Sequence, residues 1–397
     1  MNKLRILELF GGIGACSKAL EKLGIDYEIV DYVEIDKYAV KSFNAIHNTN
    51  FEPQDITQWD KDIDVDLIMH GSPCQDFSLA GKQAGGDEGS GTRSSLMYET
   101  IRIVEKLKPK YVIWENVKNL LSKKHRHNFD SYLEIMEQLG YQNYYQVLNA
   151  KDYGIPQNRE RVFTISILER NSLGFAFDIS SFQFPPKQEL KLKLKDMLED
   201  NVDEKYFISD KLLKYYDKKI AQGWRKELHT NEDIAMTICN PGRNQINDNF
   251  IKIKNATKQG YLEATDGDGI DLAQPNSETR RGRVQKDSIQ TLTTQNNLGV
   301  VIGLFDDTSS DNFAKGKRDY GYRDEYGTLK CQPKYSIYKN TDLRIRKLTP
   351  KECWRLMGFD DEDFDKASKV NSNAQLYKQA GNSIVVNVLM AIFKELL

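Results

Sequence analysis

The sequence predicts an α/β fold in which helices cover both faces of a mainly parallel β-sheet. Two observations support this prediction. Short runs of β-forming or apolar residues recur up to about residue 170, and stretches with helical spacing of apolar residues separate them. Alternation of this kind is typical of strands that are joined by crossover helices, which makes the sheet mainly parallel.

The first elements can be placed one by one. Residues 4–10 form an apolar run that ends in Gly11-Gly12-Ile13-Gly14, and a helical stretch follows to about residue 23. Residues 27–35 are rich in β-formers, and Asp36 takes the cap position of a helical stretch over 36–46. This order predicts a strand, a glycine turn, a helix, a second strand and a second helix.

The later elements continue the pattern. Residues 65–69 and 111–114 are candidates for buried strands, and apolar residues recur at helical spacing between them. A helix over about 129–139 should precede two more strands, at 144–148 and 161–167. The residues at helical spacing are Leu96, Met97, Ile101, Val104 and Leu107.

The composition changes after Phe184-Pro185-Pro186, and the chain stays polar to about residue 340. This stretch predicts a second, smaller and irregular domain. A short helix is predicted after Thr349, which forms a capping-box pattern with Glu352. Gly358 should end this helix. Residues 380–397 should begin with Gly-Asn-Ser and continue as an apolar helix. The predicted domains are 1–185, completed by 376–397, and 186–375, which includes a hinge.

Composition limits the environment of the chain. Its 397 residues contain five cysteines and no CxxC pair, which argues against a disulfide framework and a zinc ribbon. The sequence shows neither a signal-peptide pattern nor an apolar run of about 20 residues. We therefore expect a cytoplasmic protein with no bound metal and no membrane segment.

Charge alone argues mildly against a nucleic-acid partner, because the formal net charge is −2. Cations nevertheless gather locally at 279–286, 315–318 and 344–347. One such stretch is usually a solvated surface. Three in the same half of the chain make a surface that contacts phosphates plausible.

The glycine turn indicates a nucleoside cofactor. It lies at the carboxyl end of a predicted strand, where parallel sheets bind ligands. Ser17 stands where the dinucleotide fingerprint has its third glycine. Glu34 follows about twenty residues later, where an acid commonly binds ribose hydroxyls, and Asp55-Ile56 are placed to contact an adenine. These residues leave open whether the cofactor is NAD or S-adenosylmethionine.

Further reactive side chains follow strands at the same edge. Cys74 lies in a polar loop, where it is a better candidate nucleophile than a buried cysteine would be. The glycine-dense stretch 81–91 is either a flexible loop or a lid. Glu115 ends a strand and either caps the next element or joins the site. Arg159 and Arg161 should point to one face of an extended chain, for catalysis or for salt bridges.

Six motifs appear in the order in which DNA (cytosine-5)-methyltransferases carry them, and the chain resembles that family outside about residues 190–340. The resemblance implies a Rossmann-like sheet of the S-adenosylmethionine-dependent methyltransferases and a smaller target-recognition domain. It also implies a restriction–modification type of prokaryotes or phages. The motifs are Phe10–Gly14, Pro73-Cys74-Gln75, Glu115-Asn116-Val117, Gln157–Arg161, Arg346–Glu352 and Gln379–Ser383.

The resemblance also implies roles for single residues. Cys74 would attack C6 of cytosine, Glu115 would bind N3 and the exocyclic amine, and Arg161 would bind O2 with support from Arg159. S-adenosylmethionine would be the cofactor. Its binding residues would be Phe10, Gly11, Gly12, Ile13, Gly14, Glu34, Asp55, Ile56, Pro73, Asn382 and Ser383.

The implied partner is double-stranded DNA, from which the target base must be extruded, and we expect the protein to act as a monomer. The loop 75–92 would close over the site, with Ser78 and Lys82 near the DNA backbone. Thr291-Leu292 resembles the Thr-Leu pair of the recognition domain. Candidates for phosphate or guanine contacts just upstream are Arg280, Arg281, Arg283 and Lys286.

Three alternatives compete with this interpretation. A NAD-dependent oxidoreductase would share the glycine turn and Glu34 but would not explain the Pro-Cys-Gln and Glu-Asn-Val motifs. A tRNA-cytosine methylase of the same fold would keep the motifs, and the long insertion with its cationic stretches favours duplex DNA instead. A non-catalytic DNA-binding relative ranks last, because all the catalytic residue types are present.

Overall fold

The computed structural model forms two compact units. The first unit comprises Met1–Val202, Asp287–Leu298 and Leu348–Leu397, and the second comprises Asp203–Lys286 and Gly299–Lys347. The first unit therefore includes residues 186–202, 287–298 and 348–375, which the predicted boundaries assign to the second domain. The described residues are 3–73, 96–169, 182–207, 251–256, 261–265, 267–271, 281–292, 294, 298–305 and 340–397.

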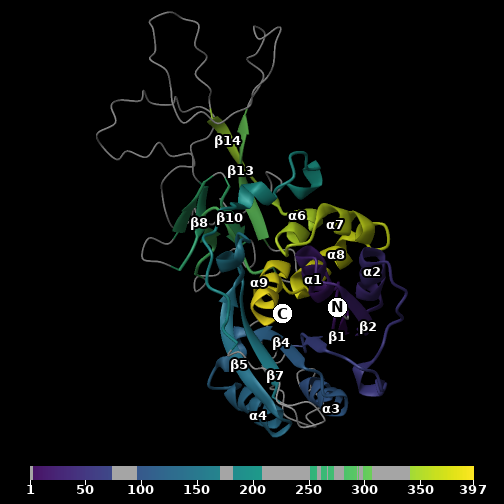
Figure 1. Cartoon of the computed structure of the whole chain (residues 1–397). Helices are drawn as coiled ribbons and strands as arrows, with labels where there is room; N and C mark the ends of the chain where they lie inside the picture. Colours follow the sequence, from purple (N-terminus) through teal and green to yellow (C-terminus); the bar gives the residue numbers. More distant parts are fainter. Residues whose placement is uncertain are drawn as a thin grey trace, which may run out of the picture. The chain divides into compact units, whose positions relative to one another are not determined.

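A six-stranded sheet forms the centre of the first unit (Figure 1). The first four strands in the sheet order pair in parallel, and β7 pairs antiparallel with both β4 and β5. The predicted α/β fold with a mainly parallel sheet is thus confirmed. The order is β2 (Tyr27–Val33), β1 (Leu4–Leu9), β3 (Leu67–His70), β4 (Tyr111–Val117), β7 (Glu160–Leu168) and β5 (Tyr141–Asn149).

The antiparallel pairing of β5 with β7 follows from the short connection between them. The connection, residues 150–159, contains a 3₁₀ turn, Ala150–Tyr153, and the two-residue strand β6 (Gln157–Asn158). A parallel pair would need a crossover of a dozen or more residues. The chain therefore returns beside β5 in the opposite direction. The start of β7 brings Arg161, with Arg159 just before the strand, to the edge where β4 ends.

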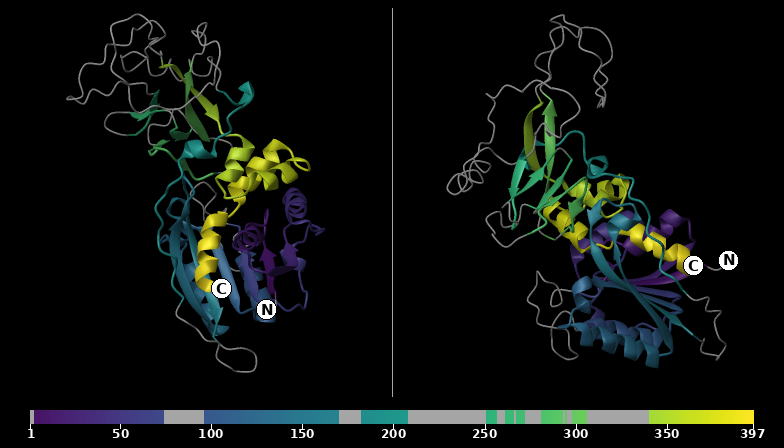
Figure 2. Two further views of the ribbon diagram at one scale, coloured as in Figure 1. Left: turned by 45° about the horizontal axis from the view of Figure 1, so that its top comes forward. Right: turned by 90° about the vertical axis from the view of Figure 1, so that its left-hand side faces the viewer.

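Helices cover both faces of this sheet. Helix α9 (Val386–Leu396) packs against α1 (Ala15–Leu23) on one face, and α3 (Met97–Leu107) and α4 (Arg126–Gln138) lie on the other, as the right-hand view in Figure 2 shows for α9 and α4. Helix α2 (Lys37–His47) follows β2. The alternation of strand side chains divides the core between the two faces. The α3–α4 side includes the buried residues Leu7, Leu9, Trp114, Phe129 and Tyr132.

Three short helices complete the first unit: α6 (Pro350–Arg355), α7 (Asp361–Ser368) and α8 (Asn373–Asn382). The capping box between Thr349 and Glu352 is present, and Gly358 adopts a φ of 84° after α6. Glu199 receives a hydrogen bond from the Thr349 hydroxyl, which holds the 186–202 segment to the first unit. No helix in the part of the chain that the structure describes is long and apolar enough to cross a membrane.

The apolar helix expected after Gly-Asn-Ser is present, and the motif itself belongs to the end of the preceding helix. Gly381 and Asn382 form the final turn of α8, and α9 starts only at Val386. Ser383 leaves the helix with a ψ of 160°, and its N–H bonds back to the carbonyls of Gln379 and Ala380. The Gly-Asn-Ser motif therefore ends one helix and turns the chain before the next.

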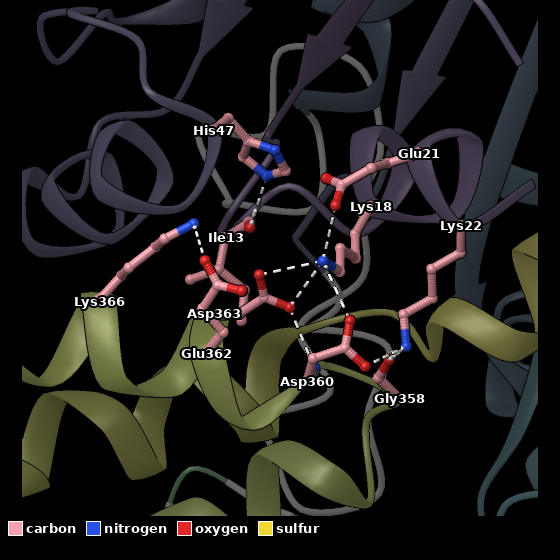
Figure 3. Close-up of polar contacts among 10 residues, drawn as sticks. All are labelled: Ile13, Lys18, Glu21, Lys22, His47, Gly358, Asp360, Glu362, Asp363 and Lys366. Carbon is pink, nitrogen blue, oxygen red and sulfur yellow. Dashed lines mark hydrogen bonds and ion pairs between the residues drawn. The ribbon is translucent and has the colours of Figure 1, made fainter. Parts of the chain in front are cut away.

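A buried ion cluster joins α1 to α7 (Figure 3). Lys18 Nζ lies 3.0 Å from a carboxylate oxygen of Asp363, 3.1 Å from one of Asp360 and 3.0 Å from one of Glu21. The side chains of Lys18 and Asp363 are only 6% and 4% exposed. Lys22 adds hydrogen bonds to the Asp360 carboxylate and to the Gly358 carbonyl.

The described residues of the second unit form strands of two to eight residues. One sheet has the order β11-β10-β13-β14, and β8 pairs with β9 in a separate hairpin. The strands β13 and β14 pair antiparallel. The bounds are β8 (Ile251–Lys254), β9 (Tyr261–Ala264), β10 (Gly269–Asp271), β11 (Val284–Gln285), β13 (Leu298–Phe305) and β14 (Asn340–Lys347).

Candidate active site and cofactor pocket

The glycine turn after β1 has an unusual backbone. Phe10, Gly12 and Gly14 have φ values of 54°, 57° and 80°. A left-handed aromatic residue is rare, and such an outlier often marks a functional site. A Cβ on Gly14 would lie 2.2 Å from the His47 ring, whereas no described atom lies within 4 Å of a Cβ on Gly12. The turn thus needs glycine at position 14 and leaves open space above position 12.

Side chains from β2 and α2 hold this turn. The Tyr32 hydroxyl donates to the Gly12 carbonyl at 2.6 Å, and Glu34 Oε2 accepts from the Gly12 N–H at 3.2 Å. The His47 Nε2 lies 3.4 Å from the Ile13 carbonyl oxygen (Figure 3). Burial lowers the pKa of His47 to about 4, so the ring is neutral at pH 7, and Nε2 carries the proton because a carbonyl can only accept. The sequence did not single out Tyr32 or His47.

Glu34 stands at the carboxyl end of β2, as expected. Its Oε1 accepts from the backbone N–H of Asp36 at 2.8 Å, so both carboxylate oxygens bind backbone N–H groups. Burial raises the pKa of Glu34, although these hydrogen bonds oppose the shift. The neighbouring Ile35 side chain is 69% exposed. An exposed apolar side chain beside this acid is a further candidate for contact with a cofactor, and sequence reasoning missed it.

Asp55 and Ile56 occupy different environments. Asp55 is exposed, and its carboxylate accepts from the Thr57 N–H at 3.0 Å, which caps the 3₁₀ turn Ile56–Gln58. Ile56 is 5% exposed and packs in the core with Trp59. The Ile56 side chain therefore supports the loop from within the core, and its carbonyl accepts a hydrogen bond from Arg102 at 3.0 Å.

Cys74, Ser78 and Lys82 lie outside the described residues, and the description of this loop stops at Pro73. The segment that leads to Cys74 is nevertheless well anchored to β4. The indole N–H of Trp114 donates to Ser72 Oγ at 2.9 Å, and the Asn116 amide donates to the Ser72 carbonyl at 3.2 Å. These two residues flank Glu115 on β4. A Cβ on Gly71 would lie 3.8 Å from Glu115 Oε2, so this carboxylate adjoins the segment.

Glu115 and Arg161 form an ion pair at this edge. Arg161 Nε lies 3.0 Å from Glu115 Oε1, and their side chains are 17% and 11% exposed. Oε1 is buried, and it accepts no aligned hydrogen bond from any residue that the structure describes. Both side chains line a small pocket. Its other lining residues are Leu148, Arg159, Phe163, Ile384, Val385 and Val388.

Arg159 has a different role from Arg161. Its side chain is buried, with 3% of the residue exposed, and it donates hydrogen bonds to three backbone carbonyls. These carbonyls belong to Leu292 at 3.1 Å, Gly381 at 3.3 Å and Ser383 at 2.8 Å. Arg159 therefore fastens two distant segments beside the pocket.

The Thr291-Leu292 pair lies in the first unit. The strand β12 (Ile289–Gln290) pairs in parallel with β6, and the Thr291 hydroxyl donates to the Asn158 carbonyl at 2.8 Å. The Leu292 N–H donates to the Gln157 side chain at 3.0 Å. The Gln157–Arg161 motif thus binds the segment with both backbone and side chains.

The expected cationic contacts separate into different environments. Arg280 lies outside the described residues, and Arg281 is exposed. Arg283 is 2% exposed and donates two hydrogen bonds to the Asp271 carbonyl, at 2.8 and 3.3 Å. A guanidinium held this way is not available to a phosphate, so Arg283 stabilises the second unit. Lys286 is exposed and forms an ion pair with Asp268 at 2.6 Å.

The C-terminal motif approaches the cofactor edge through α8. Lys378 Nζ lies 2.7 Å from the Asp36 carboxylate, and the Gln379 amide donates to the Tyr38 carbonyl at 3.0 Å. Both partners lie at the start of α2, next to Glu34. Asn382 is exposed at the end of α8, and Ser383 is 6% exposed.

The sequence matches, over residues 4–397, the family model of the C-5 cytosine-specific DNA methylases. The chain belongs to this family. The expectation of a DNA (cytosine-5-)-methyltransferase is confirmed at this level.

Several named relatives align with almost the whole chain. The orphan methyltransferase M.SPRI of Bacillus phage SPR is 34% identical over 100% of this chain and 98% of its own length. The type II methyltransferase M.HhaI of Haemophilus parahaemolyticus is 32% identical over 98% of this chain and 93% of its own. Among solved structures, the DNMT2 of Spodoptera frugiperda superposes with a TM-score of 0.57 at 21% identity, with 99% of each chain covered. This last likeness concerns the fold alone.

Proposed function

We propose that this methylase transfers a methyl group from S-adenosylmethionine to C5 of a cytosine extruded from a short, specific sequence of duplex DNA, through a transient bond between Cys74 and C6. One observation carries the proposal. The Glu115–Arg161 pair lines a pocket beside the segment that leads to Cys74, at the same edge of the sheet as the glycine turn.

The residues at the turn fit the proposed cofactor. The open space above Gly12 lets a ligand approach the backbone closely, and the carboxylate of Glu34 suits ribose hydroxyls. Phe10, Ile35, Asp55 and the Ile56 backbone would surround the adenine. The backbone of Gly11–Gly14 would lie near the methionine, with Pro73, Asn382 and Ser383 completing the pocket. When bound, S-adenosylmethionine supplies an electrophilic methyl group.

The chemistry of the base falls to this chain's own side chains. C5 of cytosine is a poor nucleophile. Addition of the Cys74 thiolate to C6 turns C5 into the nucleophilic carbon of an enamine-like system. Glu115 binds this edge of the base: a carboxyl oxygen accepts a hydrogen bond from the exocyclic amine, and the carboxyl group donates a proton to N3 as Cys74 adds to C6. Arg161 binds O2 and holds Glu115 through the ion pair. After methylation, loss of the C5 proton expels the Cys74 thiolate.

The duplex must open for this reaction, because stacking hides C6 from attack. Extrusion of the base costs a few kcal/mol, which contacts to the flipped base and the DNA backbone offset. We assign contacts with the DNA backbone to Ser78 and Lys82. We assign sequence recognition to the second unit, with Arg280 and Arg281, and to the Thr291 segment of the first unit. The enzyme acts as a monomer on double-stranded DNA.

The proposal is tested by incubating the protein with methyl-labelled S-adenosylmethionine and duplex DNA, followed by bisulfite sequencing. We expect label in DNA and protected cytosines at one short sequence. Cys74→Ala should abolish transfer and also the covalent adduct that wild type forms with duplexes containing 5-fluorocytosine. Transfer to tRNA in place of duplex DNA, or full turnover by Cys74→Ala, would overturn the proposal.

A matched pair of variants examines the acid. Glu115→Gln removes the charge at nearly constant shape and should reduce methyl transfer by about a hundredfold or more, with cofactor affinity preserved. Glu160→Gln is the control, because Glu160 is exposed and pairs with Lys118. Equal activities of the two variants would remove Glu115 from the mechanism.

A further inference from the structure

Asp31 is a buried carboxylate near the end of β2 that no step of the proposed chemistry uses. Its side chain is 3% exposed, and both of its oxygens accept two donors. Oδ1 accepts from the Tyr32 N–H and from the Gln54 amide, each at 2.9 Å. Oδ2 accepts from the Trp59 indole N–H and from Lys61 Nζ, each at 2.7 Å. All four lone-pair directions of the carboxylate are thus occupied.

Three of these four donors belong to one loop, residues 54–61. This loop carries Asp55 and Ile56, the residues expected at the adenine. Gln54 also donates its N–H to the Glu34 carbonyl at 2.9 Å and its amide to the Tyr32 carbonyl at 2.7 Å. The Asp31 carboxylate therefore binds the start of the loop and its end, and Asp55 lies between the two attachment points.

The next residue along β2 serves the opposite wall of the pocket. Side chains alternate along a strand, so Asp31 and Tyr32 point to opposite faces of the sheet. Tyr32 is fully buried, and its hydroxyl holds the Gly12 carbonyl of the glycine turn. Two consecutive residues of one strand thus fix both segments between which the cofactor would bind.

We propose that Asp31 is a positioning residue of the cofactor pocket, which sets the affinity for the adenosine part of the cofactor by fixing the loop 54–61. The proposal rests on the proposed function, since it presupposes that S-adenosylmethionine binds here. Asp31 acts through the loop and need not touch the cofactor itself.

The charge of Asp31 is well suited to this task. Burial by itself raises the pKa of a carboxyl group, but the donors from Lys61, Trp59 and Gln54 outweigh it, so the pKa of Asp31 lies below its usual value. The carboxylate stays ionised at neutral pH and forms charge-assisted hydrogen bonds, which are stronger than neutral ones.

Asp31→Asn tests the proposal, because an amide of the same shape places its NH₂ group against two of the four donors whichever way it turns. We expect the Kd for S-adenosylmethionine to rise by about tenfold. The rate of methyl transfer in a single turnover at saturating cofactor should stay within about twofold. The affinity for 5′-methylthioadenosine, which keeps the adenosine, should fall by the same factor as that for S-adenosylmethionine.

A double-mutant cycle separates positioning from general destabilisation. In an Asp55→Ala background, the effect of Asp31→Asn on the Kd should shrink to within about twofold, because both changes act on one contact. Asp66→Asn is the matched control. Asp66 accepts a hydrogen bond from the Arg5 N–H at 2.8 Å, at the amino ends of β1 and β3. Loss of this hydrogen bond should leave the Kd unchanged.

Lys61→Met provides a second route that does not threaten folding, since Lys61 is 51% exposed. It should raise the Kd by about two- to threefold. An unchanged Kd in both Asp31→Asn and Lys61→Met overturns the inference while the proposed function stands. Should Asp31→Asn fail to fold, an unchanged Kd in Lys61→Met alone overturns it. A wild-type protein that binds no S-adenosylmethionine would instead defeat the proposed function.

Discussion

The guanidinium of Arg159 donates a hydrogen bond to the carbonyl oxygen of Ser383 at 2.8 Å, although the two residues are 224 positions apart in the sequence. The same side chain reaches the carbonyls of Leu292 and Gly381. One buried cation thus joins the edge of the sheet, the Thr-Leu segment and the turn before α9. All three meet beside the pocket of Glu115 and Arg161.

Arg159→Lys should destabilise the protein although it keeps the charge. An ammonium group on a flexible stem cannot reproduce the planar fork that reaches three carbonyls, and buried acceptors are left unpaired. We expect the free energy of unfolding in urea to fall by about 1–3 kcal/mol. Arg126→Lys is the control, because Arg126 is 40% exposed in a pair within α4, and its change should stay below about 0.5 kcal/mol. Similar values for the two would contradict the assigned role.

The ion cluster in Figure 3 gives a second contrast. Lys18→Met leaves the buried Asp363 without its cation, and we expect a loss of roughly 3–5 kcal/mol in the free energy of unfolding. Lys366→Met removes an exposed pair with Glu362 on the same helix and should cost less than about 0.5 kcal/mol. Denaturant titration of both variants measures the difference. A small loss in Lys18→Met would show that the cluster contributes little.

Glu8 should make stability depend on pH. It accepts hydrogen bonds from the Ser17 N–H and hydroxyl, yet burial raises the pKa of Glu8 from 4.5 to about 7. A raised pKa means that the protonated acid favours the folded state. Its contribution is therefore complete below pH 4.5 and is lost as the pH rises through 7. The size of this contribution is about 3 kcal/mol.

Glu8→Gln carries no such titration. The free energy of unfolding of wild type, minus that of the variant, should fall between pH 5 and pH 8 when both are measured in urea. The difference isolates Glu8, because all other titrating groups are shared. A constant difference across this range would mean that the carboxyl group titrates normally.

Neighbouring arginines of the second unit should behave differently. Arg281 is exposed, so Arg281→Ala should weaken DNA binding and reduce the salt dependence of binding by about one ion, with the melting temperature unchanged. Arg283 is buried on the Asp271 carbonyl, so Arg283→Ala should lower the melting temperature. Fluorescence anisotropy at several salt concentrations and thermal melts provide both measurements. The reverse pattern would exchange the two roles.

Local patterns predicted the parts of the site that depend on local chemistry. The glycine turn and Glu34 follow strands and Glu115 lies near the end of one, and the apolar runs of these strands are short and clear, so their place at one edge followed from the fold class. The capping box at Thr349 is likewise a local signal. The residues that determine these elements lie within a few positions of them.

The rest depends on contacts between distant segments. Asp31, Tyr32 and His47 look like ordinary strand and helix residues, and only the folded chain brings them under the glycine turn and the adenine loop. The antiparallel return of β7 follows from a short connection that propensity does not reveal. Arg283 belongs to a cationic stretch, but burial gives it a structural partner.

The first unit is assembled from three separate stretches, so the polypeptide passes between the units at four places. Protein engineers who wish to graft a new specificity cannot cut out one continuous block. Residues 287–298 must remain from the host, and the donor must be spliced as two cassettes, 203–286 and 299–347. A single-block chimera would import a foreign β12 and its Arg159 contact, and would disturb the pocket along with the recognition of DNA.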